Sequence, residues 1–342
     1  MICKLCGLEK NPKTNTHYLS DFIIKSALNE NGVIKRGKGF YWGIDTSKLS
    51  VDFKFQQQAS PIILENLLGR QTTEEENKDA EENIEFTVSD KFCKECEDIF
   101  TAIETTFSEN ILPKFRNANL QNTSEIILNA KESRITRLFF LLQFWRTSIC
   151  DSAFNISENL TETLRKKILN SDDRGLEEIP LSITYLETLK DEDDTDTGTK
   201  YKTQNVVAPL ERTDPFVIIL NDFVIQLYED LLFPFYRFYG YNEIATYIDY
   251  LNLDRSYIKV KVLSNRRRKE ISSVYFTIAA KSFMRNQAWF FLNKFSQVYN
   301  RLPTNSQIQE YLISISSDKD IMKFTPEKLK ANILRHFKTM KL

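Results

Sequence analysis

The chain has 342 residues, 42% of them hydrophobic, and its 46 Lys and Arg residues balance 47 Asp and Glu residues. A net charge of −1 excludes recognition of nucleic acid or membrane by overall charge, so such a partner would need a local basic patch. With 25 Phe and 14 Tyr but only 9 Gly and 9 Pro, the composition excludes a fibrous or disordered protein and indicates a globular, helix-rich one.

Four of the five cysteines form two Cys-x2-Cys pairs, Cys3 with Cys6 and Cys93 with Cys96. Two such pairs can supply four thiolates to one tetrahedral zinc ion, and we expect structural Zn²⁺ here. An iron–sulfur cluster or unrelated buried thiols are the alternatives. The fifth cysteine, Cys150, lies in an apolar helical stretch and is expected to be an inert core thiol.

The sequence contains no apolar run long enough to span a bilayer, and residues 1–15 lack the apolar segment of a secretory leader. We therefore expect a cytoplasmic protein without a membrane partner. In that compartment thiols stay reduced, which favours metal binding over disulfides for the paired cysteines.

In the first third of the chain, residues 16–28 have apolar residues at helical spacing, and residues 32–55 carry the aromatic and β-branched residues of short strands or loops. Residues 71–85 are strongly acidic and predict an exposed loop or a solvated helix. The second cysteine pair opens a helix with a buried apolar stripe, which Pro113 ends.

From about residue 125 the pattern predicts helices over 126–150 and 158–170, and strands over 181–186, 205–209 and 216–229. Asn221-Asp222 is a candidate hairpin turn within the last of these. Residues 190–200 form an acidic linker or loop tip, and helices are expected near 272–300, 306–316 and 326–341.

Three segments around the cysteines carry a resemblance: CKLC at 3–6, THYLSDF at 16–22 and FCKECEDIFTAIETTF at 92–107. Together they resemble the HNH, or ββα-metal, nuclease group in its four-cysteine form. Within that group they look most like an uncharacterised bacterial set with Cys-x2-Cys, a "SHIIP"-like segment, and a second Cys-x2-Cys followed by Glu. The resemblance covers about the first third of the chain.

The resemblance implies a treble-clef module in which the four paired cysteines bind structural zinc. It implies that His17 lies on a strand and acts as general base on water, and that Glu97 helps hold a catalytic Mg²⁺ or Mn²⁺. The implied activity is metal-dependent endonuclease hydrolysis of phosphodiester bonds, and bacterial defence is the setting that the family suggests.

The sequence departs from the group at several positions. Thr16 stands where the group has an acidic metal ligand before the histidine, Tyr18-Leu19-Ser20 replaces apolar-apolar-Pro, and the usual Asn before the second pair has no clean match. His17 has two further interpretations, a structural histidine at a helix start or a substitute zinc ligand. Glu97 has one, a solvated first-turn residue favoured by the helix dipole. A non-catalytic zinc-binding module that recognises nucleic acid or a protein partner is the alternative function.

A basic run extends from Arg255 to Arg301 with Glu270 as its only acid, and aromatic residues are interleaved with it. Basic residues with aromatics can follow a phosphate backbone and stack bases, so nucleic acid is the expected partner. The residues expected to bind it are Arg266, Arg267, Arg268 and Lys269. The alternative is a solvated hairpin tip over 265–269 followed by an ordinary amphipathic helix.

Overall we expect an α+β protein with two domains. A zinc-stapled HNH-like module occupies 1–120, and a mostly helical domain with a small antiparallel sheet occupies 121–342. The low net charge and abundant aromatics would permit a homo-oligomer.

Overall fold

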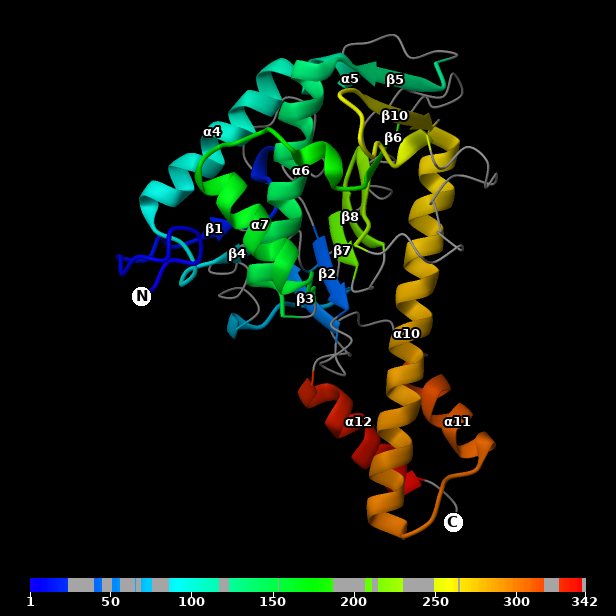
Figure 1. Ribbon diagram of the computed structural model, residues 1–342. Coiled ribbons are helices and arrows are strands. Elements are labelled where there is room, and N and C mark those ends of the chain that lie inside the picture. The colour runs from blue at the N-terminus through cyan, green and yellow to red at the C-terminus, as the bar shows by residue number, and fades with distance from the viewer. Residues whose placement is uncertain are drawn as a thin grey trace. The chain divides into compact units, whose positions relative to one another are not determined.

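The chain divides into two compact units in a computed structural model. Figure 1 labels its helices and strands. Unit 1 comprises Met1–Leu28 with Phe86–Ser272, and unit 2 comprises Asn29–Glu85 with Ser273–Leu342. The predicted boundary near residue 120 falls inside unit 1, and independent folding of residues 1–120 stays a prediction. The structure describes residues 1–23, 40–44, 51–55, 65, 69–75, 86–116, 123–152, 154–186, 207–210, 215–229, 249–263, 265–316 and 326–339.

A six-stranded sheet lies in unit 1, in the order β5-β10-β6-β9-β8-β7. Its β10–β6 pair is parallel and its other pairs are antiparallel. The α+β class is therefore confirmed, but the expected small antiparallel sheet is larger than predicted and mixed. The strands are β5 (Glu125–Leu128), β6 (Leu181–Leu186), β7 (Val207–Leu210), β8 (Phe216–Leu220), β9 (Phe223–Leu227) and β10 (Ile258–Leu263).

The predicted hairpin turn at Asn221-Asp222 is confirmed. It joins β8 to β9, with Leu220 paired to Phe223. Asn221 adopts φ 51°, a left-handed conformation that Asn tolerates better than most residues. The carboxylate of Asp222 receives the guanidinium of Arg116 at 3.0 Å, which fixes the turn against the end of a helix.

The start of the long central helix of unit 1 is set by its N-cap residue, Asn129. Residues 126–150 were predicted as one helix, but residues 125–128 pair with β10 as strand β5, because their apolar and β-branched side chains suit a sheet edge. Asn129 then caps the start of the helix with a capping box. Its side chain accepts a hydrogen bond from Glu132 N, and the Glu132 carboxylate accepts one from Asn129 N at 3.0 Å. The helices are α4 (Lys94–Asn110), α5 (Leu112–Arg116), α6 (Ala130–Cys150) and α7 (Glu158–Leu169).

Aromatic side chains join these helices to the sheet. Phe107 of α4 stacks on Phe139 of α6 with ring centroids 3.9 Å apart, and Phe140 of α6 meets Phe223 of β9 at 5.3 Å. Every residue of α6 from 136 to 147 is buried, so this part of the helix is surrounded by protein on all sides. Its polar residues therefore need partners inside the protein.

Unit 2 contains the hairpin β2 (Phe40–Ile44) and β3 (Val51–Phe55) and the helices α11 (Asn305–Ser316) and α12 (Pro326–Thr339). The long helix α10 (Asn265–Tyr299) begins in unit 1 and continues into unit 2. In unit 2 its second half, α11 and α12 form a bundle (Figure 1). Its core consists of Phe291, Phe295, Tyr311, Ile315 and Ile333.

The predicted C-terminal helices are confirmed. The alternative of a hairpin tip over residues 265–269 is wrong, because these residues form the first turns of α10. None of the helices in the described ranges combines the length and the apolar character that crossing a bilayer requires.

Candidate functional site

The first cysteine pair lies in a tight turn at the N-terminus. Cys3 N donates to Leu8 O at 3.0 Å, Gly7 N donates to Cys3 O at 2.9 Å, and Ile2 bridges Glu9 across the turn. Gly7 adopts φ 73°, a conformation that glycine reaches without the steric cost of a Cβ. In this turn the side chains of Cys3 and Cys6 point toward the same place.

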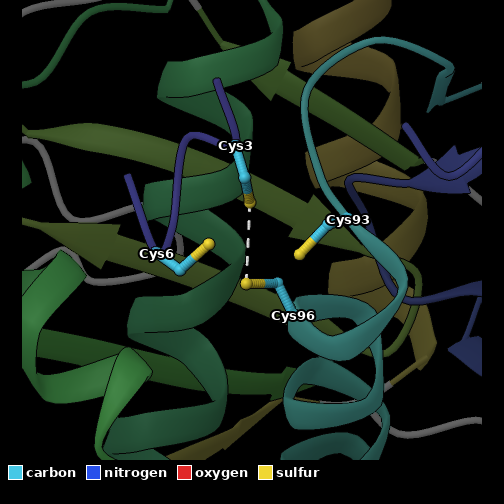
Figure 2. Close-up of side chains that lie close together, drawn as sticks. All are labelled: Cys3, Cys6, Cys93 and Cys96. Atoms are coloured by element: carbon cyan, nitrogen blue, oxygen red, sulfur yellow. Dashed lines mark hydrogen bonds between the residues drawn. The ribbon is translucent and has the colours of Figure 1, made fainter. Parts of the chain in front are cut away.

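The second pair lies at the start of α4. Cys93 is the extended N-cap residue, and Cys96 follows in the first helical turn. The N-terminal segment is tied to this entry by backbone hydrogen bonds, from Lys4 N to Lys91 O at 2.9 Å and from Lys13 N to Phe92 O at 2.8 Å. Two segments far apart in the sequence thereby converge (Figure 2).

The four cysteine sulfurs form a site with the dimensions of a single metal ion. All four Sγ atoms lie within 4.8 Å of one another, and Cys3 Sγ lies 3.6 Å from Cys96 Sγ. Tetrahedral zinc with Zn–S bonds of about 2.3 Å places its sulfurs about 3.8 Å apart. The cysteines therefore fit a zinc ion, and so compact a group favours one ion over a multi-iron cluster. His17 is not a member of this group.

Residues outside the turn hold the cysteine site in place. Arg165 of α7 donates from Nη1 to Leu5 O, between the first two cysteines, at 2.6 Å. Lys10 Nζ lies 3.2 Å from Glu95 Oε1 in the first turn of α4. Such surrounding contacts orient metal ligands and limit their motion.

The thiols differ in how readily they lose a proton. Burial opposes ionisation of Cys3, but the backbone around Cys6, Cys93 and Leu5 donates to its sulfur and lowers its pKa to about 7. Burial raises the pKa of Cys93 to about 11 and raises that of Cys96 as well. Zinc binding must therefore displace protons from the buried thiols, which makes the affinity for zinc depend on pH.

A short strand links the two cysteine segments and carries His17. Strand β1 (Thr16–His17) pairs antiparallel with β4 (Thr87–Val88), His17 lying opposite Thr87. The prediction of a helix over 16–28 is wrong at its start, because pairing with β4 makes residues 16 and 17 extended. The helix begins at Asp21, and the structure describes it as far as residue 23. Along the chain, the turn with Cys3 and Cys6 comes first, the strand with His17 follows, and the helix that begins at Cys93 comes last.

His17 is paired with a carboxylate and partly accessible. Its Nε2 lies 3.3 Å from Asp21 Oδ1, four residues later, and the two side chains are 23% and 25% exposed. This contact is an ion pair when the imidazole is protonated. Asp21 was not singled out from the sequence, although its spacing from His17 is the available signal.

Thr16 faces the opposite side of β1, since neighbouring strand residues point to opposite faces. It is 1% exposed and lies near the carboxylate of Glu97, but its hydroxyl forms no hydrogen bond with that carboxylate. Burial raises the pKa of Glu97, and the nearby guanidinium of Arg146 opposes that rise. Glu97 lies in the first turn of α4 as expected, but it is partly buried rather than solvated.

A buried polar network lies beneath this strand. Arg146 of α6, 1% exposed, donates to His17 O at 3.0 Å and to the carboxylate of Glu104. Ser20 donates from Oγ to Glu104 at 2.7 Å and from N to Gln143 Oε1 at 2.9 Å. Sequence reasoning missed these partners, although Gln143 and Arg146 stand out in an otherwise apolar run, three residues apart.

Elsewhere in the described ranges, no second group of three His, Cys, Asp or Glu side chains converges as the cysteines do. His17, Asp21 and Glu97 thus do not form a preassembled three-ligand cation site. A divalent ion at Glu97 would need substrate oxygens or water to complete its coordination.

The predicted nucleic-acid-binding residues Arg266, Arg267, Arg268 and Lys269 lie in the first turns of α10. The side chain of Arg267 is exposed; those of the other three lie outside the described part. Upstream in the basic run, Arg255 and Lys259 both pair with Asp249, at 2.9 and 3.7 Å, which reduces the charge available to a partner.

Comparison with known proteins gives no match to a protein-family model, a curated protein or a solved structure.

Proposed function

We propose that the chain is a metal-dependent endonuclease of the HNH type, with a zinc-bound treble clef that holds β1 against α4. The observation that carries the proposal is the position of His17 on a strand between a Cys-x2-Cys turn and a helix opened by the second Cys-x2-Cys. This is the order of elements that the motif resemblance implies.

The proximity of Thr16 and Glu97 supports the same interpretation. In the resembling group, the residue before the histidine and a residue early in the helix both serve the catalytic ion. Here these two positions are neighbours, although the Thr16 hydroxyl forms no hydrogen bond with the Glu97 carboxylate. Thr16 contributes a neutral oxygen where the group has an acid, so we expect weak divalent-ion binding.

In the proposed reaction His17 accepts a proton from the attacking water. A general base must come within about 2.6–3.2 Å of that proton's oxygen. Nε2 of His17 is buried beside Asp21, so Nδ1 would be the nitrogen that approaches the water. Asp21 orients the imidazole and stabilises its protonated form. Glu97 would hold Mg²⁺ or Mn²⁺, which supplies charge stabilisation at the scissile phosphate.

A second function, a zinc-stapled binding module without catalysis, is favoured by one observation. Within the described residues the only convergent ligand group is the cysteine site. A protein of this kind would keep the zinc and the fold and would recognise nucleic acid or a protein through other surfaces.

Cleavage assays distinguish the two functions. Zinc-loaded wild-type protein, His17→Ala and the control Asp98→Asn are incubated with plasmid, linear DNA and RNA, with Mg²⁺ or Mn²⁺. The nuclease proposal predicts metal-dependent cleavage that only His17→Ala abolishes, with about one zinc retained by all three proteins. Absence of cleavage of every substrate would favour the binding module.

A further inference from the structure

We propose that the bundle of unit 2 binds a nucleic-acid strand along α10, where Lys281 and Arg285 contact phosphates and Trp289 stacks on a base. This surface is separate from the residues predicted at 266–269. It does not depend on His17 being catalytic.

Positive charge is concentrated at this end of the chain. Residues 273–342 contain 11 Lys and Arg but only 4 Asp and Glu, whereas the whole chain has 46 and 47. The rest of the protein is therefore net acidic. A local basic region on an otherwise acidic chain is the distribution expected where a polyanion is recognised at one place.

The three residues of α10 form one exposed stripe. Lys281, Arg285 and Trp289 are spaced four residues apart, which puts them on one face of the helix at steps of about 6 Å. All three side chains are exposed, and Trp289 is 62% exposed. The helix carries no acidic residue between Glu270 and its end at Tyr299.

Helix α12 adds cations to the same packed body. Lys330, Arg335 and Lys338 are exposed on it. His336 and Phe337 pack on Phe291 of α10, each with ring centroids 5.7 Å apart. Within the described part of the chain, none of the cations at 281, 285, 330, 335 and 338 forms an ion pair with an acidic side chain.

Nucleic acid fits this stripe better than a lipid surface does. The large apolar residues Phe291 and Phe295 of α10 are fully buried in the bundle core, so they cannot enter a membrane. Along the stripe, Arg285 lies about one helical turn before Trp289 and Lys281 lies about two turns before it. Cations at regular steps match a phosphate backbone, and an exposed indole offers a face on which any base can stack.

Binding is measured by fluorescence anisotropy with labelled single-stranded DNA, single-stranded RNA and duplex DNA. The full zinc-loaded chain is used in a His17→Ala background, so that binding is observed without cleavage. The test variants are Lys281→Glu/Arg285→Glu and Trp289→Ala. The matched control is Lys131→Glu/Lys166→Glu, which reverses two exposed charges on α6 and α7.

The proposal predicts that reversing the α10 charges weakens binding at least about tenfold, and that the slope of log K against log salt shrinks by about 0.7–0.9 per lost phosphate contact. Trp289→Ala should weaken single-strand binding about tenfold and leave that slope unchanged. The control should bind like the parent. Circular dichroism confirms that each variant is folded.

Equal affinity in all variants, or binding to anionic vesicles but to no oligonucleotide, would overturn the proposal. The outcome is independent of the nuclease proposal. If binding depends on Lys281, Arg285 and Trp289 but the wild-type protein cleaves no substrate, the α10 proposal stands and the nuclease proposal fails.

Discussion

Arg146 donates a hydrogen bond to the carbonyl oxygen of His17 at 3.0 Å, across 129 residues of sequence. The same guanidinium binds Glu104 of α4, so one buried side chain of α6 connects the histidine strand with the helix that the second cysteine pair opens. The candidate site is thus built on the core of unit 1, and changes in α6 should affect it.

Replacing Arg146 with Met should destabilise the protein by about 3–5 kcal/mol, because Glu104 then loses the cation that compensates its partly buried charge. The double variant Arg146→Met/Glu104→Gln should recover part of that loss. Urea unfolding curves measure both. Arg134→Met, at an exposed ion pair of 3.9 Å, is the control and should change stability by less than about 0.5 kcal/mol. Equal losses in the single and double variants would contradict a compensating role for Arg146.

Cys96→Ser should abolish zinc binding and lower the melting temperature, because three sulfurs leave the tetrahedral site incomplete and Cys96 is buried within it. Elemental analysis and differential scanning calorimetry test this. Cys150→Ser removes a thiol outside the group and should keep one zinc per chain. Full zinc content in Cys96→Ser would show that the four cysteines do not form the metal site.

Asp21→Asn should reduce cleavage about tenfold, because Asn keeps the size of the side chain beside His17 but removes the charge that stabilises the protonated imidazole. Removing the base itself should cost about 10²–10⁴-fold. Single-turnover rates on one substrate compare the two variants. Asp98→Asn, an exposed carboxylate one turn into α4, serves as the control. A rate unchanged by Asp21→Asn would exclude Asp21 as a positioning residue.

The bundle of unit 2 should lose stability as the pH falls below about 6.5. Burial against Phe291 and Tyr311 lowers the pKa of His336 below its usual 6.5, and Glu310 opposes this weakly. The unfolded chain therefore takes up the proton first as the pH falls, and stability present at neutral pH is lost through the lowered pKa.

His336→Gln should remove that dependence. Hydrogen exchange of α12 amides at pH 7.0 and 5.5, corrected for intrinsic rates, gives the local stability. Wild-type protein should lose protection at the lower pH more than the variant does. The same loss in both proteins would assign the pH dependence to other groups.

Local patterns predicted the cysteine group and most helices, since two residues between cysteines and a repeated apolar spacing are short-range signals. Apolar spacing could not predict that residues 16 and 17 form a strand, because its partner lies at 87 and 88, whereas the motif resemblance implied a strand at His17. Apolar spacing favoured a helix there, and long-range pairing decided otherwise.

The partners of the histidine strand also lay beyond a local pattern. Arg146 and Gln143 belong to a helix whose neighbouring residues are apolar, and only the fold brings them to Ser20 and His17. Unit 2 combines residues 29–85 with residues 273–342, and no local sequence pattern predicts that these two segments belong together. The predicted treble-clef nuclease identity stays a proposal that chemistry must test.

The most direct test is plasmid nicking by zinc-loaded protein with Mn²⁺ or Mg²⁺, comparing wild type with His17→Ala. We expect nicking by the wild type and a loss of about 10²-fold or more in the variant, with zinc content and melting temperature preserved. Equal nicking by both proteins, or loss of zinc from His17→Ala, would contradict the assignment of His17 as the general base.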